Sequence, residues 1–167
     1  MYFGYNNKKG WMCMEYRLET LSRTSVLGVK KEYGTGQKAQ EDIFNFWMDF
    51  DDKGKKQELM PLGNNQLQGL LAVYKPHANG EVHCLIGVTN DTDEAQWQRT
   101  ELSEGRYIVF DAKGPVPESI KKGMEKINRH ILPTLDYEFR DAPFFELYKE
   151  GPIRSEEYIT EIWLPIV

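Results

Sequence analysis

Cysteine and long apolar segments are scarce in this sequence. Its 167 residues include two cysteines, Cys13 and Cys84, which do not form a pair at metal-ligand spacing. Residues 1–14 contain no continuous apolar stretch of the kind found in secretory signals. No run approaches the roughly 20 apolar residues that span a bilayer. These absences predict a soluble protein of the reducing cytoplasm, with no membrane partner.

An excess of positive charge is also lacking. The chain has 21 Lys and Arg against 26 Asp and Glu, a net charge of -5 and a pI near 5.3. Affinity for nucleic acid depends mainly on clustered Lys and Arg that release counterions from phosphates. Direct binding to nucleic acid is therefore not expected.

Signatures of covalent or metal-assisted catalysis are missing. No serine lies in a Gly-x-Ser-x-Gly context, and His77, His83 and His130 show no triad or metal spacing. His83 and Cys84 are consecutive residues of a predicted strand, where side chains point to opposite faces, so structural roles are favoured over a catalytic pair. We predict no metal and no cofactor.

The sequence does contain a core-forming composition, with 40% hydrophobic and 13% aromatic residues. In its first half, period-two alternation predicts strands at 14–23 and 25–34, and two more β-rich runs follow at 67–75 and 82–90. Between these pairs lies a stripe at i, i+3, i+4, i+7 spacing, formed by Ile43, Phe46, Trp47 and Phe50. The predicted order is strand, strand, helix, strand, strand.

The second half repeats this order. Strands are predicted at 97–105, 106–114, 144–151 and 158–167. The intervening helix opens near Pro115 and Pro117 and ends at Pro133. Its apolar stripe consists of Ile120, Met124, Ile127 and Ile131.

Two such ββαββ units predict an α+β fold with an antiparallel sheet and two main helices. The units can share one core by joining their sheets edge to edge or face to face. The junction between them is a natural position for a ligand groove. We place the halves at approximately 14–92 and 95–167, and treat residues 1–13 as an N-terminal tail.

One carboxylate occupies an otherwise aromatic strand. In "PFFELYKEG", residues 143–151, alternation places Phe144, Glu146 and Tyr148 on one face. In the last strand, Glu161 shares a face with Trp163, and it can approach the same cavity as Glu146 if the strands are suitably registered. A solvated strand face explains this pattern about as well as a site does. An inward-facing Glu among aromatic rings would suit a lipophilic cation.

The stretches "GRYIVFDAKGPVPESIKKGMEKINRHILPTLDYEFRDAPFFELYKEG" and "ITEIWLPIV" resemble the GyrI-like small-molecule-binding domain. This domain is also the effector-binding domain of AraC-type and MerR-type bacterial transcription activators. The resemblance rests on Gly105 with Tyr107, Gly114, Leu132 with Pro133, Pro143 through Tyr148, and Glu161 through Pro165. The first half is looser but compatible, and residues 14–167 are covered in all. The family often has a Trp in the second helix, where this chain has Met124 or Ile127.

The resemblance implies duplicated ββα(ββ) units related by a pseudo-twofold axis, with a central ligand groove. By the Phe-Glu-x-Tyr motif, the acidic floor of that groove corresponds to Glu146. The implied aromatic walls are Tyr107, Tyr148, Trp163, Trp47 and Tyr74. For Trp47, a place on the apolar helix stripe favours the core over the groove.

Three functions follow as hypotheses. About 13 residues precede the first strand, too few for a helix-turn-helix, so the chain resembles a stand-alone member that captures hydrophobic or cationic small molecules. Alternatively, it is a hydrolase of electrophilic cyclopropane-bearing compounds, in which Glu146 acts with Glu161 or Tyr148. A third hypothesis is an interaction protein that inhibits DNA gyrase, which would require a protein partner.

Overall fold

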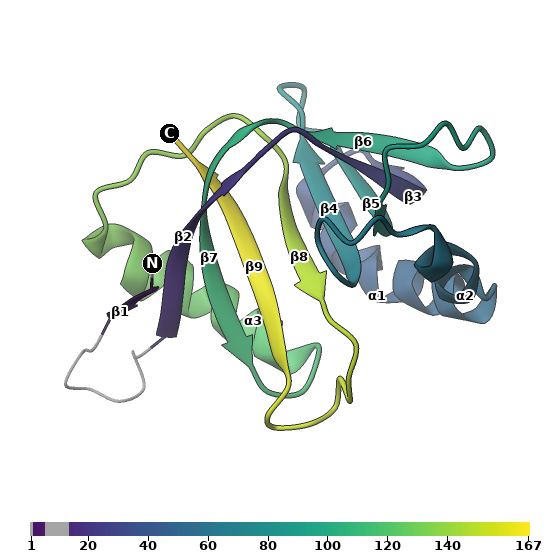
Figure 1. Ribbon diagram of the computed structural model, residues 1–167. Coiled ribbons are helices and arrows are strands. Elements are labelled where there is room, and N and C mark those ends of the chain that lie inside the picture. Colours follow the sequence, from purple (N-terminus) through teal and green to yellow (C-terminus); the bar gives the residue numbers. More distant parts are fainter. Residues whose placement is uncertain (1, 6–13) are drawn as a thin grey trace.

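A computed structural model describes residues 2–5 and 14–167. Its strands form one antiparallel sheet of nine strands, with helices packed along one face (Figure 1). Within the predicted tail, β1 (Tyr2–Tyr5) pairs with the strand that begins at Met14, and the rest of the tail lies outside the described residues. No helix in the described ranges combines the length and apolar character needed to span a bilayer.

The first half has the predicted order of elements. They are β2 (Met14–Leu21), β3 (Thr24–Tyr33), α1 (Gly36–Asp52), β4 (Leu70–Pro76) and β5 (Val82–Thr89). The helix α1 begins after Thr35, whose hydroxyl accepts a hydrogen bond from the backbone N–H of Lys38 at 3.1 Å. A short helix, α2 (Lys55–Leu59), and a 3-10 turn at Met60–Leu62 follow α1, and the sequence did not predict either.

The second half also follows the prediction. Its elements are β6 (Gln98–Leu102), β7 (Gly105–Lys113), α3 (Glu118–Lys126), β8 (Phe144–Tyr148) and β9 (Ile159–Ile166). The helix continues past α3 as a π-helical turn at Ile127–Ile131 and a 3-10 turn at Leu132–Thr134.

The buried side of this second helix differs in part from its predicted stripe. Its buried residues follow a spacing of four and are Ser119, Gly123, Ile127 and Ile131. The last step of this spacing, from Ile127 to Ile131, spans the wider π-helical turn at the end of the helix. Ile120 and Met124 are therefore only half-buried. Gly123 allows close packing, since an added Cβ would lie 3.3 Å from the Cβ of Ala112.

The strand order shows how the two halves are joined. Across the sheet it runs β1-β2-β7-β9-β8-β4-β5-β3-β6. The corresponding strands of the two halves are β2 and β6, β3 and β7, β4 and β8, and β5 and β9. If β1 is left out and each strand is replaced by its counterpart, the same order is obtained in reverse. A pseudo-twofold axis therefore passes between β4 and β8. The halves therefore meet edge to edge. They also exchange their first strands, because β2 pairs with β7 of the second half and β6 pairs with β3 of the first.

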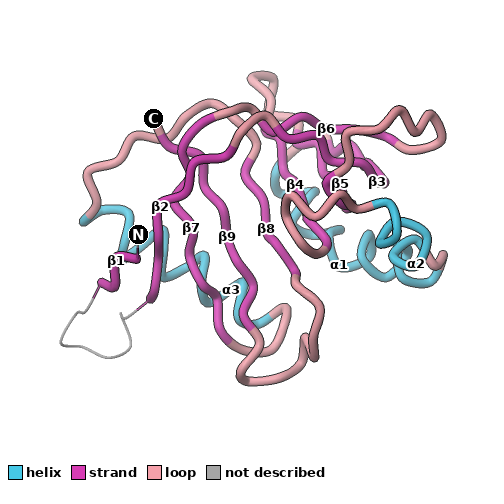
Figure 2. Tube along the Cα trace, in the orientation of Figure 1, coloured by secondary structure: helices cyan, strands magenta, loops and turns pink. Residues whose placement is uncertain are grey.

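The helices lie on one face of the sheet (Figure 2) and cover two separate cores. One core packs beneath α1 and includes Phe46, Phe50 and Ile86. The other packs beneath the α3 helix and includes Ile127 and Ile162. The central strands β4 and β8 lie where these two cores meet.

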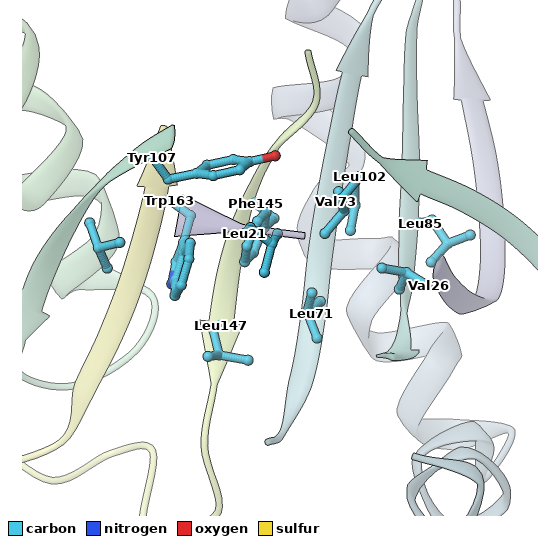
Figure 3. Close-up of a cluster of buried hydrophobic side chains, with 11 residues drawn as sticks. Leu21, Val26, Leu71, Val73, Leu85, Leu102, Tyr107, Phe145, Leu147 and Trp163 are labelled. Atoms are coloured by element: carbon cyan, nitrogen blue, oxygen red, sulfur yellow. The ribbon is translucent and has the colours of Figure 1, made fainter. Parts of the chain in front are cut away.

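The opposite face of the sheet has its own core, to which both halves contribute (Figure 3). It contains Tyr107, Phe145 and Trp163 from the second half and Val73 and Leu85 from the first. Alternation along β8 thus sends Phe145 and Leu147 to this face, while Glu146 goes to the helical face.

Candidate ligand-binding site at the centre of the sheet

Glu146 lies at the middle of β8, next to the pseudo-twofold axis. Its residue partner on β4 is Ala72, and its partner on β9 is Ile162. The side chain points to the helical face, and Glu146 is only 9% exposed. The carboxylate predicted from the Phe-Glu-x-Tyr motif therefore faces inward.

Two tyrosines satisfy one oxygen of this carboxylate. The hydroxyl of Tyr148 donates a hydrogen bond to Glu146 Oε1 at 2.7 Å, and the hydroxyl of Tyr74 donates to the same atom at 3.3 Å. Tyr148 is on the same strand as Glu146, whereas Tyr74 comes from the other half of the chain. The site thus combines side chains from both sides of the junction.

Aromatic rings extend outward from these two tyrosines. Tyr74 stacks on Phe144 with ring centroids 5.1 Å apart and an interplanar angle of 18°. Trp47 of α1 meets Tyr148 edge to face, with centroids 5.1 Å apart. Sequence alternation had placed Phe144 on the face of Glu146, but Phe144 was missing from the predicted site residues.

Burial controls the charge state of the site. Loss of solvent raises the pKa of the Glu146 carboxyl, and the hydrogen bonds from Tyr148 and Tyr74 oppose this rise without cancelling it. Burial, together with the nearby carboxylate, also raises the pKa of both tyrosines. The two phenols are therefore protonated donors at neutral pH.

Cys84 lies beside this group and was not predicted as part of it. It is the β5 partner of Tyr74 and is buried. Burial and the charge of Glu146 raise the pKa of its thiol to about 12. Because the thiolate is the nucleophile, this cysteine is inert at neutral pH.

Three of the predicted site residues lie on the opposite face of the sheet. The register pairs Glu146 with Ile162, and it pairs Glu161 with Leu147. The prediction that Glu146 and Glu161 approach one cavity is therefore wrong. Tyr107 and Trp163 share the face of Glu161 and belong to the core between the two halves. The helical face brings together Glu146, Tyr148, Tyr74 and Trp47.

Glu161 has a different electrostatic environment from Glu146. Its Oε2 lies 3.0 Å from Arg17 Nη2 and 3.0 Å from Lys149 Nζ, and its Oε1 accepts the indole N–H of Trp163 at 3.0 Å. Burial acts to raise its pKa, but the hydrogen bond from Lys149 and the charge of Arg17 hold the pKa of Glu161 below its usual value. This acid is fully paired within the protein.

Little solvent reaches Glu146, because the residue is only 9% exposed. One surface hollow of about 410 Å³ lies near Asp111 and Ser119, and another of about 340 Å³ lies near His77 and Asp141. Glu146 lines neither of them. A ligand that reaches the carboxylate must therefore displace some of the aromatic rings around it.

Comparison with known proteins identifies similar chains. The sequence model of a family described as the GyrI-like small molecule binding domain matches residues 14–167. A candidate bacterial transcription regulation protein from Staphylococcus aureus MU50 has 35% identity and a TM-score of 0.86, with 92% of this chain and 98% of that chain covered. The SAV2435 protein, solved bound to tetraphenylphosphonium, also has 35% identity and a TM-score of 0.86, over 92% and 94% of the two chains.

A more distant structure shares the fold. An integron cassette protein from the mobile metagenome of Vibrio cholerae has 15% identity and a TM-score of 0.64, with 99% of each chain covered. Among curated proteins, none matches the sequence.

Proposed function

We propose, from the premise that this chain belongs to the GyrI-like small molecule binding domain family, that it captures lipophilic cations at Glu146. The family assignment covers small-molecule binding in general. In this protein we place Glu146 at the floor of the pocket and expect the preferred compounds to carry positive charge. We place this capture in the cytoplasm.

The observation that carries this proposal is the contrast between two buried acids. Glu161 is held by Arg17 and Lys149. Glu146 forms no ion pair with a side chain of residues 14–167, and the hydrogen bonds to its carboxylate come from two neutral phenols. A buried carboxylate is costly unless it is protonated or paired with a cation. A bound cation would supply the missing charge.

The surrounding rings suit a cation whose charge is shielded by apolar groups. The rings of Tyr74 and Tyr148 lie beside the carboxylate, to which their hydroxyls donate. Phe144 packs against Tyr74, and Trp47 packs against Tyr148. Aromatic faces attract cations, and this attraction strengthens when the cation is desolvated. The complex of SAV2435 with tetraphenylphosphonium supports the choice of ligand class.

A matched ligand pair tests the charge requirement. Binding of methyltriphenylphosphonium, a cation, and triphenylphosphine oxide, a neutral compound of similar shape, would be measured by titration calorimetry. We expect the wild type to prefer the cation by tenfold or more, about 1.4 kcal/mol or above. Glu146→Gln should abolish that preference. Glu150→Gln removes one negative charge from an exposed residue and should leave the preference intact.

Two results would contradict this proposal. One is equal binding of both compounds by the wild type. The other is an unchanged preference for the cation in Glu146→Gln, with circular dichroism showing that the variant is folded.

A second candidate function is hydrolysis. The raised pKa of Glu146 and its 2.7 Å hydrogen bond to Tyr148 are features of a general acid or base. Glu161 does not assist, because it lies on the other face. Product formation from an electrophilic cyclopropane-bearing compound, lost in Glu146→Gln, would favour this function over simple capture. Release of the same compound unchanged would reject it.

A further inference from the structure

We propose that the β4–β5 hairpin holds a second site, which binds a divalent transition metal between His77 and His83. The two residues are six apart in sequence and show no motif. The hairpin brings them together, because the backbone N–H of His77 donates to the carbonyl of Glu81 at 2.8 Å. As a result, His77 Nε2 and His83 Nδ1 lie 3.0 Å apart.

The orientation of His83 suits a metal ligand. Its other nitrogen, Nε2, lies 3.3 Å from Glu81 Oε2, so the ring donates its N–H to that carboxylate and leaves the lone pair of Nδ1 facing His77. Ligating histidines almost always have such a carboxylate, carbonyl or water partner on the second nitrogen, which fixes the tautomer. Glu81 is thus a positioning residue for Nδ1.

A third ligand is within reach on the neighbouring strand. Glu32 of β3 is the register partner of His83, so the two side chains share a face of the sheet. Glu32 Oε1 lies 3.9 Å from His83 Nδ1, and its side chain is 66% exposed and free to rotate. No group of three metal-ligating side chains is already assembled within the described part of the chain. Rotation of Glu32 would complete one here.

The spacing of the two nitrogens indicates which metals would fit. With metal–nitrogen bonds of about 2.0–2.1 Å, a separation of 3.0 Å corresponds to an angle of roughly 90–97° at the metal. That angle suits square-planar or octahedral coordination, as adopted by Cu²⁺ and Ni²⁺, better than the tetrahedral sites of Zn²⁺. We therefore expect the order Cu²⁺ over Ni²⁺ over Zn²⁺.

Binding would move one proton within the His77 ring. Because the lone pair of His83 Nδ1 faces it, His77 Nε2 carries the proton of the hydrogen bond between the two rings. The metal takes the lone pairs of His77 Nε2 and His83 Nδ1, and His77 becomes its Nδ1–H tautomer, so both rings stay neutral and no net proton is released. Local charge is mixed: Glu32 and Glu81 favour a cation, while Lys75 is the β4 partner of His83 and opposes it.

To test this proposal, Ni²⁺ would be titrated into tag-free protein, and its binding would be measured by calorimetry. We expect one equivalent to bind, with binding lost in His77→Asn and in His83→Asn. Glu81→Gln should weaken it about tenfold, the usual effect of removing such a partner, and Lys75→Gln should strengthen it. His130→Asn removes the one other histidine, which lies on the second helix, and should have no effect.

Spectroscopy with Cu²⁺ separates this site from weak surface binding. The electron paramagnetic resonance spectrum should show coupling to two imidazole nitrogens in the wild type and should lose it in His77→Asn, which alters only the hairpin turn. Absence of Ni²⁺ binding, or binding that persists unchanged in either His77→Asn or His83→Asn, would overturn the proposal. Neither outcome affects cation capture at Glu146, which is measured with phosphonium compounds.

Discussion

Tyr74 and Tyr148 hold equivalent positions on the two central strands, and both donate a hydrogen bond to the same oxygen of Glu146. The register explains this convergence. Ala72 of β4 lies opposite Glu146 of β8, and each tyrosine is two residues further along its own strand. Because β4 and β8 are antiparallel and related by the pseudo-twofold axis, the two phenols approach the carboxylate from opposite directions.

Cation binding should depend on pH because it needs the ionised form of Glu146. The pKa of this carboxyl is raised above its ordinary value of 4.5 by burial. Below the raised pKa the protonated acid dominates, so affinity for methyltriphenylphosphonium should fall by up to about tenfold for each further unit of pH. Titrations over a pH series would measure this fall. In Glu146→Gln the affinity should not vary with pH, and a parallel fall there would assign the effect to another group.

The two tyrosines should contribute unequally to the charge state of Glu146. Removing a hydroxyl removes a donor that favours the carboxylate, so the pKa of Glu146 should rise further. Tyr148→Phe should move the pH midpoint of cation binding upward by more than Tyr74→Phe, because its hydrogen bond is 2.7 Å long against 3.3 Å. The same pH series measures both variants. Equal pH midpoints in both variants and the wild type would show that these hydrogen bonds do not affect the pKa of Glu146.

Glu146 should lower the stability of the unliganded protein at neutral pH. Since its folded-state pKa is raised, the folded protein holds more protons than the unfolded chain between the two pKa values, and stability falls as the pH rises through that range. Glu146→Gln should therefore raise Tm at pH 7, by about 2–4 °C for each kcal/mol gained. Below pH 4.5 the difference between the two proteins should shrink.

Thermal unfolding followed by circular dichroism would measure this effect. Glu150→Gln serves as the control, because Glu150 is exposed. A lower Tm for Glu146→Gln at pH 7 would contradict the assignment of an uncompensated buried charge.

The acid on the opposite face should behave differently. Arg17→Met leaves Glu161 buried without its guanidinium partner, and breaking a buried pair in this way costs about 3–5 kcal/mol. Lys149→Met should cost under about 1 kcal/mol, because the lysine side chain is 56% exposed. Urea unfolding would give both values. The double variant Arg17→Met with Glu161→Leu should recover much of the stability lost in Arg17→Met, because no buried charge is then left unpaired. A loss in the double variant equal to the sum of the losses in Arg17→Met and Glu161→Leu would argue against the pairing.

Much of the fold could be predicted from sequence because local patterns determine it. Alternating and β-rich runs predicted eight of the strands, and the helical stripe placed Phe46 and Phe50 in the core beneath α1. The phase of the second helix was partly wrong, since residue spacing alone does not reveal the π-helical turn at Ile127–Ile131. The pairing of β2 and β6 with strands of the opposite half could not be predicted either, because strand partners are set by long-range packing.

The candidate site could also be predicted only in part, namely where it depends on a single strand. The motif around Glu146 located the acid and Tyr148 on one face, because alternation within one strand is a local property. Which face Glu161 shares depends on the register between β8 and β9, and a slip of one residue would reverse the answer. Tyr74 was among the predicted wall residues, but its hydrogen bond to Glu146 depends on the pairing of β4 with β8.

The opposition of Ala72 and Glu146 across the pseudo-twofold axis bears on why the two halves are one polypeptide. If two identical halves associated as separate subunits, every residue beside the axis would occur twice, and a glutamate there would face its own copy. Like charges at such a distance disfavour joint ionisation, so that arrangement would hold two competing acids. Covalent fusion lets the two copies diverge. The small side chain of Ala72 on one side then leaves room for the single negative charge of Glu146 on the other.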